Sequence, residues 1–119
     1  MELTEVEKMA LSQCSQQERE CIYQAVRATM MSDGDSAEPE QGLLDEMAAM
    51  LALGEQEREQ SKGIERSVLV STIHGMNYFK RLATGKLMTQ MVYADGIITQ
   101  REQLFIQHVF DQFNIPVAD

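Results

Sequence analysis

An acidic motif occurs twice in this chain, and the repeat constrains the fold more than any other feature. Asp33-Gly34 and Asp95-Gly96 are each followed, in the same register, by a glutamate, Glu40 or Glu102. A largely apolar stripe with helical spacing precedes each copy at the same offset. The two stripes are Ile22, Ala25, Val26, Thr29 and Met30, and Thr84, Leu87, Met88, Met91 and Val92. Apolar-rich runs follow at 43–53 and 104–115. The chain therefore predicts two helix–turn–helix repeats, at about 16–54 and 77–116.

Capping signals and helix breakers predict the remaining elements. Thr4 and Ser15 are each followed three residues later by Glu, which is the form of a capping box. The stretch 64–73 has a strand-like composition, but no second strand candidate exists to pair with it, which favours a helix. The polar stretch 55–62 is either a helix end or a linker. We expect a single all-α domain over residues 1–119, with six or seven helices. The main helices should span about 4–13, 15–32, 39–54, 64–73, 77–95 and 99–113.

The stripes and the runs after them also predict the core. Residues at equivalent stripe positions should face inward and be buried. The predicted core residues are Val26, Met30, Leu51, Leu87, Met91, Val92, Phe105 and Val109.

The charge balance excludes one class of partner. The chain has 19 acidic and 10 basic residues, for a net charge of −9. Nucleic-acid binding is driven by clustered Lys and Arg, and here only Lys80 and Arg81 are adjacent. No apolar run approaches the length of a membrane span, and residues 1–10 do not resemble a secretory signal. We therefore expect a cytoplasmic protein whose cysteines, Cys14 and Cys21, are reduced.

The two acidic turns predict a cation site, with Asp33, Glu40, Asp95 and Glu102 as the candidate metal ligands. If a pseudo-two-fold axis brings the turns together, their carboxylates form a set of hard oxygen ligands. Such a set suits Ca²⁺, Mg²⁺ or Mn²⁺.

The alternative is that the turns are purely structural. Asp-Gly ends helices without any further role, and Glu102 can form a capping box with Thr99. Glu40 has no such partner, because position 37 is Ala. That difference favours a role shared by both glutamates.

An EF-hand calcium loop does not fit either turn. Gly96, Ile98 and Glu102 match its sixth, eighth and twelfth positions, but the first and third positions are Met91 and Tyr93. Both belong to the incoming helix.

Residues 93–102 (YADGIITQRE) resemble the TerB-like family, the helical domains associated with tellurite resistance. The family has Ala-Asp-Gly, a short turn and Glu after an apolar helix. The first repeat matches more loosely, since Ser32 replaces the Ala and Pro39 alters the turn. The resemblance covers roughly residues 16–116. It implies an all-helical fold of two pseudo-symmetric halves, with a metal chelated by the four carboxylates named above.

No pattern indicates catalysis. His74 and His108 are isolated in the sequence, and no phosphate-binding loop or nucleophile motif is present. Two functions follow as expectations. One is a non-enzymatic, TerB-like cation-binding domain in a stress response of the tellurite type. The other is a protein–protein interaction module whose Asp-Gly turns only cap helices.

Overall fold

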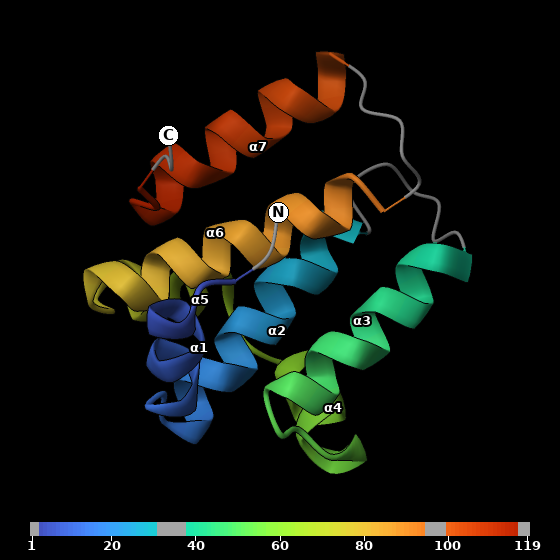
Figure 1. The fold of residues 1–119 in the computed structure, drawn as a ribbon, viewed down its shortest axis with the longest axis vertical. Coiled ribbons are helices and arrows are strands. Elements are labelled where there is room, and N and C mark those ends of the chain that lie inside the picture. The colour runs from blue at the N-terminus through green and yellow to red at the C-terminus, as the bar shows by residue number, and fades with distance from the viewer. Residues whose placement is uncertain (1–2, 31–37, 95–99, 117–119) are drawn as a thin grey trace.

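The computed structural model describes residues 3–30, 38–94 and 100–116, and for residues 30 and 38–40 it describes the backbone alone. Seven α-helices and no strand lie in these ranges (Figure 1). They are α1 (Glu5–Ser12), α2 (Gln16–Met30), α3 (Glu38–Met50), α4 (Glu55–Ser61), α5 (Arg66–His74), α6 (Tyr78–Val92) and α7 (Gln100–Phe113). The predicted all-α class is confirmed for this part of the chain. None of the seven helices could span a bilayer, being too short or too polar.

Two helices of equal length, α2 and α6, form the centre of the fold and pack against each other. Helices α1, α3 and α7 also contact α6, while α3, α4 and α5 contact α2. In Figure 1 both central helices run from left to right. Every side chain of the two predicted stripes that the structure describes is buried, including the hydroxyl-bearing Thr29 and Thr84. Their hydroxyls donate to the carbonyl oxygens of Ala25 and Lys80, four residues earlier, so neither buried hydroxyl is left unpaired.

Six of the eight predicted core residues are buried: Val26, Leu51, Leu87, Met91, Val92 and Val109. The side chain of Met30 lies outside the described part of the chain. The prediction for Phe105 was wrong, because this side chain is only partly buried against the core. The buried residues of α7, Val109 and Phe113, lie in its second half, and Phe105 belongs to the first half.

The predicted end of α3, at about residue 54, was wrong. Gly54 was expected to stop this helix, but α3 ends at Met50 and Ala52 takes the left-handed conformation, with φ of 56°. The N–H of Leu53 donates to the carbonyl of Ala48 at 2.9 Å, and the N–H of Ala52 to that of Ala49 at 3.0 Å. This pair of bonds is a Schellman motif, which usually places Gly at the left-handed position. Gly54 is instead the N-cap of α4.

The segments between the two predicted repeats are helical. Residues 55–62, for which a linker was one interpretation, form the short helix α4. The ambiguous stretch with strand-like composition is α5, as predicted, and α5 packs against α2 and α7. Tertiary contacts therefore override the β propensity of its valines and isoleucine.

The offset between the two acidic motifs in the sequence, from Asp33 to Asp95, recurs in the helix bounds. α2 begins at Gln16 and α6 at Tyr78, and they end at Met30 and Val92. α3 begins at Glu38 and α7 at Gln100. α7 also ends in a Schellman motif, with Asn114 at φ of 56° and a 2.8 Å bond from the N–H of Ile115 to the carbonyl of Phe110. Asn114 and Ile115 follow Ala52 and Leu53 at this same repeat offset.

Candidate functional site

The structure describes only part of the predicted cation site. Asp33 and Asp95 lie outside the described residues, as do the glycines that follow them. Glu40 is the third residue of α3 and Glu102 the third residue of α7, so the two glutamates hold equivalent helix positions. The side chain of Glu102 is partly buried, and it interacts with other groups of the protein. Within the described ranges no three His, Cys, Asp or Glu residues gather closely enough to hold a metal ion.

A glutamate at the third helical position is a general feature of this chain. Besides Glu40 and Glu102, it occurs in α1 (Glu7), α2 (Glu18) and α4 (Glu57). In α1 and α2 it forms the predicted capping box, in which each helix end satisfies two backbone N–H groups. A helix-capping role is therefore available to a glutamate at this position without any cation.

Glu7 is the most deeply buried acidic residue that the structure describes, with 1% of its surface exposed. Its Oε1 accepts from the N–H of Thr4 at 2.7 Å and from Nζ of Lys86 at 2.7 Å. Burial alone would raise the pKa of Glu7, but Lys86 and Thr4 together hold the pKa below its ordinary value. Oε2 of Glu7 has no hydrogen-bond partner among the described groups. The ionised Glu7 side chain thus links α1 to α6 through its ion pair with Lys86.

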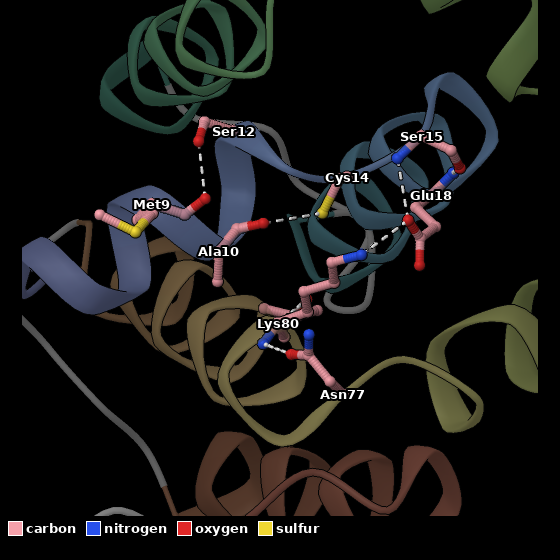
Figure 2. Close-up of polar contacts among 9 residues, drawn as sticks. Met9, Ala10, Ser12, Cys14, Ser15, Glu18, Asn77 and Lys80 are labelled. Atoms are coloured by element: carbon pink, nitrogen blue, oxygen red, sulfur yellow. Dashed lines mark hydrogen bonds and ion pairs between the residues drawn. The ribbon is translucent and has the colours of Figure 1, made fainter.

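Glu18 makes the matching contact at the start of α2. Figure 2 shows Lys80 extending from α6 to the Glu18 carboxylate, beside Ser15. The distance from Nζ to Oε1 is 3.1 Å, and the same oxygen accepts from the N–H of Ser15 at 2.8 Å. Burial would raise the pKa of Glu18, but the Ser15 N–H and Lys80 lower it overall. Glu18 and Lys80 are separated by the repeat offset, 62 residues, so this ion pair joins the third residues of α2 and α6.

Arg19 and Arg81, which follow Glu18 and Lys80 in the sequence, each form a hydrogen bond from a central helix to the C-terminal end of a later helix. Nη1 of Arg19 donates to the carbonyl oxygens of Leu51 at 3.0 Å and Ala52 at 3.5 Å. Nη1 of Arg81 donates to the carbonyl of Asn114 at 2.5 Å. Arg19 and Arg81 are related by the repeat offset, and so are Ala52 and Asn114, whose carbonyls they bind. A helix C-terminus carries unpaired carbonyls and partial negative charge, which favour a cation at this place.

Sequence reasoning missed Lys80, Lys86 and the two arginines. Comparing the halves position by position over their whole length, rather than only near the acidic turns, would have found Arg19 and Arg81. No local signal pairs Glu7 with Lys86, because their contact joins segments 79 residues apart.

The cysteines do not form a reactive centre. Both thiols are free and buried. Burial raises the pKa of Cys14 to about 11, and burial also raises the pKa of Cys21 despite a hydrogen bond with Thr72. Thiols that remain protonated at neutral pH are poor nucleophiles and poor metal ligands.

Comparisons with protein-family models, with curated proteins and with solved structures find no match to this chain.

Proposed function

We propose that this protein is a non-enzymatic, TerB-like helical domain that binds a divalent cation (Ca²⁺, Mg²⁺ or Mn²⁺) through Asp33, Glu40, Asp95 and Glu102. In this proposal it acts in the cytoplasm, in a stress response of the tellurite-resistance type. Its fold consists of two pseudo-symmetric halves, α2–α3 and α6–α7.

The repeat offset supports the two halves. Helix bounds, the bonds from Arg19 and Arg81, and the left-handed residues Ala52 and Asn114 all recur at that offset. The ion pair between Glu18 and Lys80 adds a sign of two-fold symmetry. A residue contacts its own equivalent only near a two-fold axis, as at the centre of an isologous interface.

The observation that carries the cation proposal is the direction of the central helices. α2 and α6 pack together and run the same way in Figure 1, so the C-terminal ends of the two helices lie at the same end of the pair. Equivalent acidic turns at one end of a parallel pair can present Asp33 and Asp95 to a common ion. α3 and α7 lie on opposite sides of the pair in this view, and in this proposal their third residues, Glu40 and Glu102, complete the set of ligands.

A specific observation favours the alternative function, an interaction module with purely structural turns. Glu7 and Glu18 hold the same helix position as Glu40 and Glu102, and their roles are capping and ion pairing within the protein. Exposed large apolar side chains, among them Met9, Phe79 and Leu104, offer contact area for a partner.

Thermal melting with and without divalent cations separates the two functions. A cation that binds only the folded state stabilises it by about 2.7 kcal/mol at a hundredfold excess over Kd. For a domain of this size the melting temperature then rises by several degrees relative to EDTA. Calorimetric titration gives the stoichiometry, which is one ion for a shared site and two for separate turns.

Glu40→Gln is the most informative variant. A capping role tolerates Gln at the third position, whereas a cation site loses a charge. We expect Glu40→Gln to remove most of the cation-induced shift and to leave the melting temperature in EDTA unchanged. Glu57→Gln, at the same position of α4, is the matched control and should retain the full shift. If no divalent cation moves the wild-type melting curve away from that in EDTA, the interaction module is the better account.

A further inference from the structure

A cavity of about 470 Å³ lies between α2, α3 and α4, and the residues that line it do not include the four predicted cation ligands. Three of the chain's ten basic residues line it, although the net charge of the chain is −9. The lining residues are Tyr23, Arg27, Gln41, Leu44, Glu55, Arg58, Glu59 and Lys62.

Tyr23 and Arg58 provide fixed donors at the wall of this cavity. Tyr23 is 3% exposed, and its hydroxyl oxygen accepts from Nε of Arg58 at 3.1 Å. The guanidinium carbon of Arg58 also lies 5.5 Å from the centre of the Tyr23 ring. The phenol retains one proton to donate, and no group among the described residues accepts it. This hydroxyl can therefore donate to an acceptor that enters the cavity.

Arg27 follows Tyr23 by one helical turn and is the cation with the most unused donors. Its Nη1 donates to the side-chain oxygen of Gln24 at 2.9 Å, and it joins no ion pair among the described residues. Arg58 pairs with Asp45 at 2.6 Å and Lys62 with Glu59 at 2.9 Å. The carboxylates of both pairs are largely exposed, so the pairs contribute little free energy and can exchange partners.

The lining side chains differ in their exposure. Tyr23 is buried and Arg27 and Arg58 are half-buried, whereas Lys62 and the two lining carboxylates, Glu55 and Glu59, are exposed. Three of the donors are therefore less exposed than the lining carboxylates, which favours an anion at Tyr23, Arg27 and Arg58.

The cavity lies beside a residue, Tyr23, whose equivalent in the other proposed half is of a different type. Gly85 is the equivalent of Tyr23 at the repeat offset, and there a Cβ would be 2.5 Å from Cγ2 of Ile115 and 3.2 Å from Cζ of Phe110. The end of α7 thus closes on α6 at Gly85, whereas Tyr23, covered in part by Arg58, lines a cavity. This divergence provides a cavity for the α2–α3 half.

We propose that this cavity binds a small oxyanion, a carboxylate or a phosphate group, held by Tyr23, Arg27 and Arg58. The anion accepts from the Tyr23 hydroxyl and from the unused guanidinium N–H groups of the two arginines. Planar guanidinium groups bind carboxylate and phosphate oxygens in pairs. The proposed anion site and the proposed cation site share no residue.

The test is a titration of the full chain followed by two-dimensional NMR of backbone amides and arginine Nε–H groups. The probes are inorganic phosphate and succinate, each at low ionic strength, with sodium chloride at matched ionic strength as the reference. We expect saturable shifts confined to residues of α2, α3 and α4 with at least one probe. Saturation by phosphate alone assigns a phosphate ligand, and saturation by succinate alone assigns a carboxylate ligand.

Variants decide whether the named side chains bind the probe. Arg27→Gln should weaken binding about tenfold or more, and Tyr23→Phe a few-fold, as expected for one charged and one neutral hydrogen-bonding group. Arg101→Gln, an equal loss of charge on the exposed surface of α7, should change affinity by less than about twofold. The proposal fails if neither probe produces shifts beyond those of chloride. It also fails if Arg101→Gln weakens binding as much as Arg27→Gln does.

Discussion

Gly85 is the position where one added methyl group tests the packing of α7 against α6 most directly. It lies in the middle of α6 and is buried, and its missing side chain leaves room for the end of α7. A Cβ at this position would lie 2.5 Å from Cγ2 of Ile115, well inside the 3.5–4.0 Å of ordinary carbon contact. We therefore expect Gly85→Ala to force Ile115 away from α6.

Two opposing effects set the change in the free energy of unfolding that Gly85→Ala causes. Replacing Gly by Ala within a helix stabilises it by about 1 kcal/mol. Overpacking a filled core costs about 1–3 kcal/mol. The close atom belongs to a side chain that can give way in part, so a net loss of about 1 kcal/mol is expected. In an Ile115→Ala background the overlap with Cγ2 is absent, and the same Gly85→Ala change should stabilise the fold by up to about 1 kcal/mol.

Urea unfolding of the four proteins in this double-mutant cycle measures the coupling, which we expect to be about 2 kcal/mol. The sign of the Gly85→Ala effect should reverse between the two backgrounds. If Gly85→Ala stabilises the wild-type chain as much as the Ile115→Ala chain, α7 does not approach α6 at this position and the packing argument is wrong.

Three further predictions concern stability. Ala52→Gly should raise the free energy of unfolding by about 0.5–1 kcal/mol, because Ala52, just after α3, is left-handed, whereas Ala49→Gly within α3 should lower it by up to about 1 kcal/mol. Glu7→Gln should cost about 3 kcal/mol near neutral pH by leaving Lys86 without its buried partner. Because the folded-state pKa of Glu7 is lowered, its stabilising effect is complete above about pH 5 and is lost as pH falls through that pKa. Chemical unfolding from pH 7 to pH 3 should therefore show a shallower loss in Glu7→Gln than in the wild type. Phe105→Ala should cost about 1–3 kcal/mol, less than truncation of a fully buried Phe, and a loss above about 4 kcal/mol would contradict its partial exposure.

Helix positions were predictable where periodicity and caps agreed. Thr4 and Ser15 mark the starts of α1 and α2 through hydrogen bonds between residues three apart, and such local bonds can be inferred from sequence alone. The stripes of α2 and α6 were predictable for the same reason, since burial of one helix face imposes a period of about 3.6 residues.

The errors arose where a local preference competed with a distant contact. Gly54 is the better residue for a left-handed helix end, but Ala52 takes that place and Leu53, next to it, is buried in the core. Burying one leucine gains about 1.5–3 kcal/mol, which exceeds the strain of one left-handed alanine, about 1–2 kcal/mol. Phe105 lies on the apolar face of α7. Whether this face is covered over its full length depends on where the neighbouring helices end. The sequence of α7 does not contain that information.

The candidate cation site was predictable as a pattern of residues and not as a geometry. Glu40 and Glu102 share a helix position, as the offset in sequence implies. Whether carboxylates from two turns meet depends on the packing of α2 against α6, which no local rule gives.

The proposed anion cavity was missed for a related reason. Tyr23 and Arg27 lie one turn apart on α2, but Arg58 and Lys62 come from another part of the chain, and only the fold brings the two pairs together.

If the chain consists of the two proposed halves, the contact between Glu18 and Lys80 shows what one chain with two such halves can do that two identical chains cannot. In a symmetric dimer of identical chains, a residue on the two-fold axis meets a copy of itself, so either charge would repel its equivalent. Joining the halves in one chain allows the two positions to differ, and here one is acidic and the other basic, with Nζ and Oε1 3.1 Å apart. Tyr23 and Gly85 differ in the same way, with a cavity on one side and close packing on the other. In the proposed arrangement, therefore, the equivalent positions that have diverged in sequence are the places where the two halves have acquired separate tasks.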